Sequence, residues 1–133
     1  MDFSAKIKPG LTHSASSRCD EKNTALALGS GSLPVYATPA MAALMEQAAA
    51  ELTEELLPAE WTSVGTRLEL SHTSATPCGL AVRAEARILS VDGRSIAYEL
   101  RAFDEKGEIG HGHHERFLVQ RQRFLQKAEH KLP

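Results

Sequence analysis

Glu46 is the only charged residue in the otherwise largely apolar run from Pro39 to Ala50. A helix that is apolar on all sides is normally buried in a core, and an unpaired carboxylate is costly to bury. We therefore expect Glu46 to have a partner, to have a shifted pKa, or to lie at the mouth of a functional site. This carboxylate is the first candidate for acid–base chemistry in the chain.

A histidine and a threonine are the side chains that could act with this carboxylate. His72 follows Leu68 and Leu70 on one face of an alternating run, so we expect it to point toward the helix. A histidine on an apolar face is more often a satisfied core residue, but histidine is also the usual general base near neutral pH. Thr38 precedes Glu46 by about 12 Å of helix rise. Its hydroxyl either caps the helix or lies among free backbone N–H groups that suit a carbonyl oxygen or an anion.

The histidine-rich segment 110–116 has residue types that bind metals. His111, His113 and Glu115 share one face of a strand, and two histidines with a carboxylate can bind zinc or iron. Side chains at these positions span roughly 13 Å, however, which is too far for three ligands to reach one ion. We interpret the segment as a solvated strand and expect no metal site.

One long helix must carry the threonine and the glutamate. Thr38-Pro39 predicts a sharp start, because threonine is a good N-cap and proline is favoured at the first helical position. Pro58 predicts an end shortly before it. The helix is expected over residues 39–56, and its second half is amphipathic.

Four runs in the second half of the chain alternate between apolar and polar residues, which is typical of antiparallel strands with one buried face. Asp92-Gly93 and the longer segment 104–107 predict hairpin turns. Further strands are expected near residues 11–14 and 24–28. The predicted fold class is α+β, with one apolar helix and a sheet that curls around it. The four runs cover residues 64–72, 80–88, 96–102 and 109–121.

The length, net charge and composition of the chain limit the class of protein. Residues 1–133 fit one domain, in which the polar segments 1–23 and 122–133 are expected to be loosely ordered extensions. A formal charge of −2 and 5% aromatic residues argue against nucleic acid or an anionic membrane as partner. We recognise no membrane span and no signal peptide. Cys19 and Cys78 are interpreted as free thiols of a reducing compartment, so we expect a cytoplasmic protein.

The ordered set of these residues resembles the fluoroacetyl-CoA thioesterase-like branch of the hot-dog-fold thioesterases. The resemblance covers about residues 33–120, and the set with its spacing is far more specific than any single motif. The matching segments are Ala37-Thr38, Met41 to Glu46, Gly65-Thr66, Ser71 to Pro77 and His114-Glu115-Arg116.

The resemblance implies the hot-dog fold, in which an antiparallel sheet wraps a long central helix. It also implies a homodimer with sites at the subunit interface, and it leaves open whether dimers pair into tetramers. The implied activity is hydrolysis of an acyl-CoA thioester to free acid and CoA, with no metal or redox cofactor. Coenzyme A enters only as part of the substrate.

The resemblance also assigns roles to five residues. Thr38, Glu46 and His72 correspond to the catalytic triad. Gly65 matches a glycine whose backbone lies beside the thioester, and Arg116 matches an arginine that helps to hold the acyl-CoA.

The segment before the catalytic threonine departs from the family pattern. The fluoroacetyl-specific enzyme carries phenylalanines in a lid there, whereas this chain has Gly29-Ser-Gly-Ser32. We therefore expect a thioesterase for a small acyl group and do not predict fluoroacetyl specificity.

Several alternatives stay open at the level of the sequence. Thr38 or a water attacks with His72 as base, while Glu46 either orients the base or attacks the acyl carbon itself. The glycine–serine lid favours the alternative of a non-catalytic hot-dog dimer that binds an acyl thioester or a small ligand. A dehydratase or isomerase that acts on an acyl thioester is a third, weaker possibility.

Overall fold

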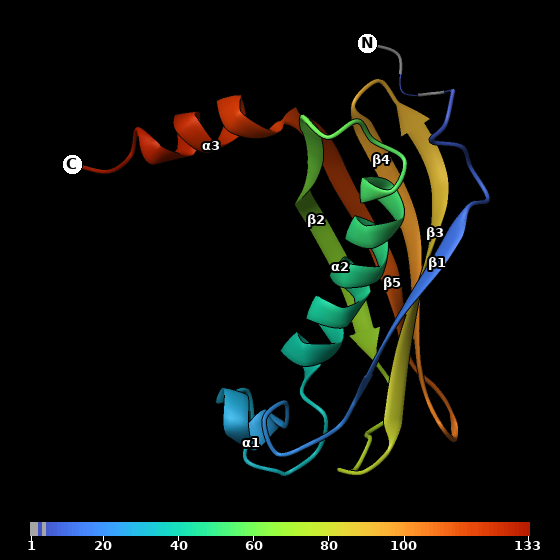
Figure 1. The fold of residues 1–133 in the computed structure, drawn as a ribbon. Helices are drawn as coiled ribbons and strands as arrows, with labels where there is room; N and C mark the ends of the chain where they lie inside the picture. Colours follow the sequence, from blue (N-terminus) through green and yellow to red (C-terminus); the bar gives the residue numbers. More distant parts are fainter. Residues whose placement is uncertain (1–2, 4) are drawn as a thin grey trace.

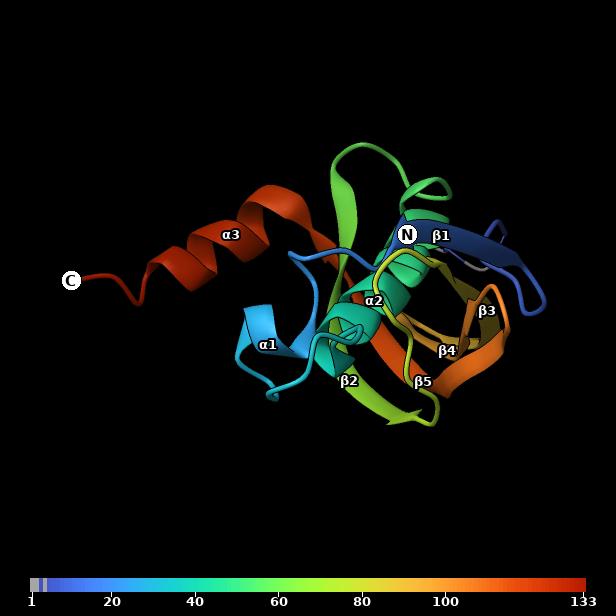
Figure 2. The same ribbon diagram turned by 90° about the horizontal axis from the view of Figure 1, so that it is seen from below.

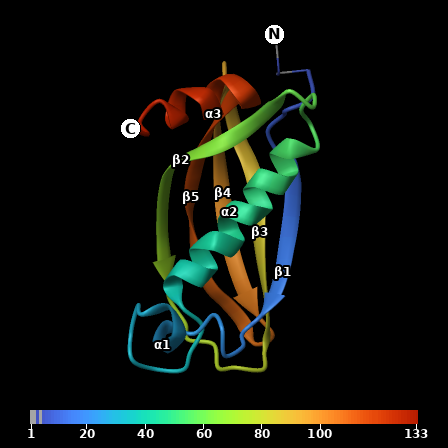
Figure 3. The same ribbon diagram turned by 60° about the vertical axis from the view of Figure 1, so that its left-hand side comes forward.

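The long helix α2 (Thr38–Glu54) crosses the concave side of the sheet (Figures 1 and 3). The structure is a computed structural model that describes residue 3 and residues 5–133. Ala37 is the N-cap of α2 and makes no side-chain hydrogen bond, so the prediction that Thr38 caps the helix is wrong. Because Thr38 lies one residue inside the helix, its hydroxyl is left for another partner. The side chains of α2 that pack into the core are Met41, Leu44, Met45, Ala48, Ala49 and Leu52.

Five antiparallel strands form one sheet in the order β1-β3-β4-β5-β2. This arrangement confirms the predicted α+β class and places β2 at an edge of the sheet (Figure 3). Two predicted hairpins are also confirmed, because Asp92 pairs with Ser95 and Asp104 pairs with Gly107. The strands are β1 (Thr12–Arg18), β2 (Trp61–His72), β3 (Ala81–Asp92), β4 (Ser95–Asp104) and β5 (Gly107–Gln120).

A β-bulge at Thr66 interrupts β2, where the register with β5 shifts between Gly65 and Arg67. Strict alternation predicted that Gly65 and Leu68 lie on opposite faces. The bulge adds one residue and reverses the alternation, so both face the helix. A Cβ atom on Gly65 would lie 2.7 Å from Glu46 Oε2. The predicted face of residues before the bulge is therefore wrong.

The N-terminal segment is more ordered than predicted. Phe3 and Ile7 are buried in the core, and β1 pairs with β3 along its whole length. The strand that we expected at residues 24–28 is instead the short helix α1 (Ala25–Leu28). Thr24 accepts a hydrogen bond from the N–H of the third residue after it and thereby caps α1.

The C-terminal segment forms helix α3 (Arg121–Glu129) rather than a loosely ordered extension. This helix leaves the end of β5 and extends away from the sheet, past the edge strand β2 (Figures 1 and 3). Phe124 and Leu125 of α3 are exposed. Within the described part of the chain, no helix is long and apolar enough to span a membrane.

Candidate active site

Thr38 and His72 meet where α2 begins and β2 ends. Thr38 Oγ1 lies 2.8 Å from His72 Nδ1. Burial lowers the pKa of His72 below its usual value of 6.5, so the imidazole is neutral at neutral pH. A neutral imidazole with its proton on Nε2 accepts the hydroxyl proton at Nδ1. The pair therefore has the geometry of a nucleophile and its base.

A cavity of about 280 Å³ opens beside this pair. The segment that contains α1 covers it, and Figure 2 shows α1 beside the first turn of α2. Ala25, Ser30 and Val35 line the cavity from this segment. The segment is fixed at its end by a hydrogen bond from the N–H of Tyr36 to Thr76 O, at 2.8 Å. Tyr36 also lines the cavity from this segment, so the cover consists of three small side chains and one buried tyrosine.

The other ring nitrogen of His72, Nε2, is buried and makes no hydrogen bond of normal geometry to residues 3 and 5–133; the nearby Ser74 backbone raises the pKa of the ring and opposes part of the effect of burial. Leaving a buried donor or acceptor without a partner is costly. A carboxylate is the acceptor that would orient an imidazole with a proton on Nε2. Glu46 does not fill this role within the same chain, because it lies about two helical turns, or roughly 12 Å, from Thr38.

Glu46 instead belongs to a second cluster, with Gly65, His114 and Arg116. Its Oε2 atom lies 3.8 Å from Arg116 Nη1 and 3.9 Å from His114 Nε2. The side chain is 45% exposed, so this carboxylate is not enclosed in the core, and it has the charged partner that was one of the three expected possibilities. The exposure has a simple cause: the neighbouring position on the edge strand is Gly65, which has no side chain to cover the carboxylate.

His114 is a member of this cluster that the sequence interpretation missed, because segment 110–116 was taken as solvated strand. The side chain is 1% exposed. Nδ1 lies 2.7 Å from Arg67 O, and a carbonyl oxygen only accepts, so Nδ1 carries a proton. Arg116 Nη1 donates to Nε2 at 3.1 Å. His114 is therefore neutral, in agreement with burial, which lowers its pKa.

Arg116 is fixed against the start of β2. Its Nε donates to Ser63 Oγ at 2.7 Å, and its Nη2 donates to Ser63 O at 3.1 Å. The guanidinium is buried, and Nη1, which also donates to His114 Nε2, lies 3.8 Å from Glu46 Oε2. Arg116 and Gly65 thus lie together, as the two substrate-binding positions were expected to.

The sequence predicts no metal site in segment 110–116 and free thiols at Cys19 and Cys78. His111 and His113 are exposed, and the described residues contain no group of three His, Cys, Asp or Glu that could hold a metal ion. Cys19 and Cys78 are free, with their Sγ atoms 4.0 Å apart. Burial raises the pKa of Cys19 to about 11, which keeps that sulfur as a thiol.

Known proteins include relatives of this chain in both sequence and fold. The family model for fluoroacetyl-CoA-specific thioesterases matches residues 19–122. The fluoroacetyl-CoA thioesterase of Streptantibioticus cattleyicolor is 38% identical over 99 residues, which are 74% of this chain and 71% of that protein. A solved structure of the fluoroacetyl-CoA thioesterase superposes with a TM-score of 0.89 at 31% identity, over 96% of this chain and 98% of that one.

A more distant structure shows the same fold. The hot-dog-like protein of Thermanaerovibrio acidaminovorans superposes with a TM-score of 0.90 at 23% identity, over 100% of this chain and 98% of that one. The curved sheet around α2 is therefore a hot-dog fold, as the sequence resemblance implied.

Proposed function

The chain belongs to the family of fluoroacetyl-CoA-specific thioesterases and hydrolyses acyl-CoA thioesters, and we propose that a homodimer assembles its catalytic triad. Thr38 and His72 come from one copy, and Glu46 comes from the other. The observation that carries this proposal is the buried Nε2 of His72, which has no partner among the described residues of its own chain. Glu46, a half-exposed carboxylate, is an acceptor that a second copy can supply.

The edge strand β2 supports a dimer. It has 12 residues and one unpaired side, and a long free edge is a template for pairing with another chain. Two copies related by a twofold axis can pair these edges antiparallel. The end of each β2, at His72, then lies along the first half of the other strand, where Gly65 and Glu46 are found.

The proposed reaction has two steps. Thr38 Oγ1 attacks the thioester carbonyl carbon and transfers its proton to His72 Nδ1, while Glu46 of the second copy accepts a hydrogen bond from His72 Nε2. The carbon–sulfur bond breaks, and the CoA sulfur takes the proton from His72. Water then attacks the Thr38 ester with His72 again as base, which releases the free acid and restores the hydroxyl.

The remaining site residues have supporting roles in this proposal. In the first turn of α2, Pro39 has no N–H and the N–H of Met41 donates to Ala37 O. Among the described residues, this leaves the N–H groups of Thr38 and Ala40 to stabilise the negative oxygen of the tetrahedral intermediate.

The backbone at Gly65 lies beside the thioester. Arg116 and neutral His114 hold the Glu46 carboxylate in place and contribute to binding the acyl-CoA.

A complementation experiment tests the shared triad. Thr38→Ala and Glu46→Gln chains are each expected to be nearly inactive alone. In a mixture of the two, half of the dimers are mixed, and each mixed dimer has one complete site, so roughly a quarter of the wild-type rate should return. A mixture of Thr38→Ala with His72→Ala is the matched control, because both defects lie in the same half of the site. No recovery with Glu46→Gln, or a monomer by light scattering, would contradict the proposal.

The attacking atom has its own test. A single turnover in ¹⁸O-labelled water, followed by mass spectrometry of the protein, tests for attack by Glu46. If Thr38 or a water attacks, label enters only the released acid. Label in the peptide that contains Glu46 would show instead that the carboxylate attacks and forms an anhydride.

We also propose a small acyl substrate without fluoroacetyl specificity. The support is a cavity of about 280 Å³ whose cover includes the small side chains of Ala25, Ser30 and Val35 and, as its one aromatic residue, Tyr36. Thiol release from acetyl-, fluoroacetyl-, butyryl- and octanoyl-CoA should give similar kcat/KM values for the first two and a steep fall with chain length. A preference of a hundredfold or more for fluoroacetyl-CoA would overturn this part.

Two further expectations remain proposals. The proposed steps use only protein side chains and water, so we expect thiol release to be unaffected by a chelator. The unbonded sulfur atoms of Cys19 and Cys78 fit a reducing compartment, and we propose a cytoplasmic location. Secretion of the tagged protein from its native cell would contradict it.

A further inference from the structure

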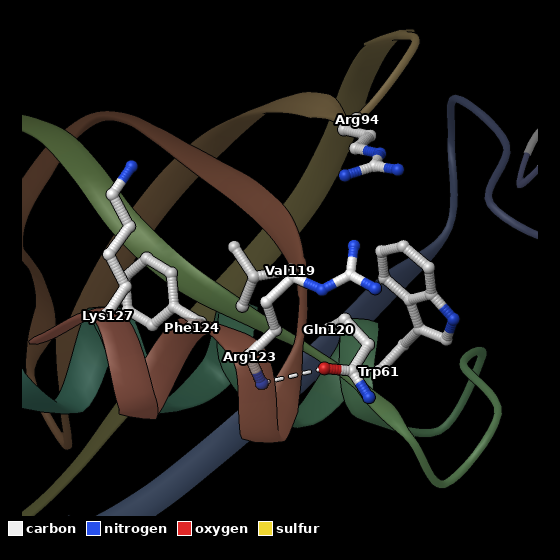
Figure 4. Close-up of a pocket in the computed structure, with 7 residues that line it drawn as sticks. All are labelled: Trp61, Arg94, Val119, Gln120, Arg123, Phe124 and Lys127. Atoms are coloured by element: carbon white, nitrogen blue, oxygen red, sulfur yellow. Dashed lines mark hydrogen bonds between the residues drawn. The ribbon is translucent and has the colours of Figure 1, made fainter.

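A second cavity, of about 350 Å³, lies far along the edge strand from the Thr38–His72 pair. It is formed where β2 begins, where β5 ends, and where α3 extends outward (Figure 4). The mechanism above does not use it. We call it the α3 pocket; its lining residues are Trp61, Arg94, Val119, Gln120, Arg123, Phe124 and Lys127.

The α3 pocket is cationic. Arg94, Arg123 and Lys127 line it, and none of its lining residues is acidic. Within residues 3 and 5–133, none of these three cations forms an ion pair; the ion pairs of arginine there involve positions 67, 83, 87, 101, 116 and 121. Unpaired guanidinium and ammonium groups around one cavity favour an anion, and arginine forks match phosphate oxygens best.

The α3 pocket also offers aromatic surfaces. Trp61 is held by an edge contact with Phe3, at 5.0 Å between ring centroids, and the Arg94 guanidinium lies 4.8 Å from the indole centroid. Phe124 presents its ring from α3, and the residue is 44% exposed. Aromatic faces and arginine planes stack on any nucleobase, because every base has a flat π-face. Phosphate-binding cations beside stacking surfaces indicate a nucleotide.

The position of the α3 pocket suits one end of the substrate. Trp61, Ser63 and Gly65 share a face of β2, because the bulge comes after them. The distance from Trp61 to Gly65 is about 13 Å along the strand, and Arg116 bonds to Ser63 between them. A thioester beside Gly65 therefore lies about 13 Å along the strand from the α3 pocket, within reach of the nucleotide end of the same substrate.

We propose that the α3 pocket binds the 3′-phosphorylated adenosine diphosphate portion of coenzyme A, so that the enzyme selects CoA thioesters over thioesters of bare pantetheine or of a carrier protein. This inference rests on the proposed function. The cations bind the phosphates, and Trp61 or Phe124 stacks on the adenine. Binding should weaken as salt is raised, because the contacts are charge-based.

A binding experiment tests the pocket without hydrolysis. Trp61 is the only tryptophan of the chain, so its fluorescence reports events in the α3 pocket alone. Adenosine 3′,5′-bisphosphate, which has no thioester, should change this fluorescence saturably, whereas uncharged adenosine should do so only weakly. Arg123→Ala/Lys127→Ala should weaken binding about tenfold or more. Lys131→Ala removes a cation beyond the pocket and serves as the matched control.

A kinetic experiment tests the link to the substrate. For acetyl-CoA, the Arg123→Ala/Lys127→Ala variant should raise KM about tenfold with kcat nearly unchanged, while acetyl-pantetheine should be hydrolysed equally by both proteins. Arg94→Ala, which lies in a turn and not in α3, should act in the same direction and guards against local unfolding of that helix.

The outcomes separate this inference from the proposed function. If all proteins hydrolyse acetyl-CoA and acetyl-pantetheine with the same KM, the α3 pocket does not bind the CoA nucleotide, and the thioesterase stands. If nucleotide binds but KM for acetyl-CoA is unchanged in the variants, the pocket holds a free nucleotide, which also overturns the proposal. If no thioester is hydrolysed, the proposed function fails, and the fluorescence titration still decides whether the pocket binds the nucleotide.

Discussion

At the start of α2, Thr38 and His72 form a neutral, hydrogen-bonded pair under small covering side chains, whereas two turns later Glu46 faces a fixed guanidinium and a neutral histidine at the open edge of the sheet. We call the Thr38–His72 pair the first half-site and the cluster around Glu46 the second half-site. In the first, the His72 imidazole has one nitrogen without a hydrogen-bond partner in the described part of the chain. In the second, the Glu46 carboxylate is exposed enough to accept a further hydrogen bond. Each half lacks what the other has, which is why we propose that two chains together complete the triad.

The largest effect should come from the first half-site. Replacing His72 with Gln removes the base and should lower kcat/KM for acetyl-CoA about a thousandfold, within the usual range for acid–base groups. Adding Thr38→Ala to it should cost little more, because the two side chains act as a unit. Thiol-release kinetics measure both. Additive losses would mean that the two side chains act in separate steps.

The next effect comes from the carboxylate. Glu46→Gln keeps the shape of the side chain and removes its charge, so turnover should fall about a hundredfold or more. Glu46→Asp should retain part of the activity, since the carboxylate remains but is withdrawn by one methylene. If the Gln variant has wild-type turnover across short acyl-CoAs, Glu46 has no catalytic role.

A smaller change acts on the packing of the second half-site. In Gly65→Ala, the new Cβ would lie 2.7 Å from Glu46 Oε2 and 3.2 Å from His114 Cε1. The exposed carboxylate can move aside, so we expect kcat to fall about tenfold with little change in Tm. The double variant Gly65→Ala/Glu46→Asp should recover activity relative to Gly65→Ala. Absence of recovery would assign the loss to the backbone at Gly65 instead.

The smallest expected effect is that of lowering the pH on the rate and on the free energy of unfolding. Burial lowers the pKa of His72 and of His114 below 6.5, so the rate should exceed half of its maximum at pH 6.5 and reach its plateau at a lower pH than an ordinary histidine would give. The unfolded chain binds more protons below that pH, so the free energy of unfolding should decrease as the pH falls through 6.5 and below. Profiles of kcat/KM and Tm against pH measure both. A half-maximal rate above pH 6.5 would contradict a buried neutral base.

Much of the fold could be predicted from local signals. The apolar run and the Thr38-Pro39 start predicted α2, with an error of two residues at its C-terminal end. The alternating runs and their turn residues predicted β2 to β5. The same signals failed at residues 24–28, where the Thr24 cap and Gly29 favour a short helix over a strand. Alternation alone did not find the bulge at Thr66, although Gly65 directly before it is a residue type that indicates a bulge or a close backbone approach within a strand.

The site was predictable only in part. Thr38 and His72 lie in contact, but the exposure of Glu46 depends on its position beside an edge strand, which no local pattern states. His114 shares its strand face with buried Leu118, so the alternation of β5 did contain the signal for its burial. Its protonation state depends on Arg67 and Arg116, which come together only in the folded sheet.

The bulge at Thr66 also has a consequence for how this enzyme could be altered. It divides β2 into two stretches whose inward-facing positions are out of phase by one residue. Deleting Thr66 would remove the extra residue and leave one regular alternation, in which Ser63, Gly65 and Leu68 still face inward. One deletion would thus test the bulge itself without changing which side chains support Arg116 or which one contacts Thr38. The two stretches on either side of the bulge can be redesigned separately, the first for how the substrate is held and the second for how it is cleaved.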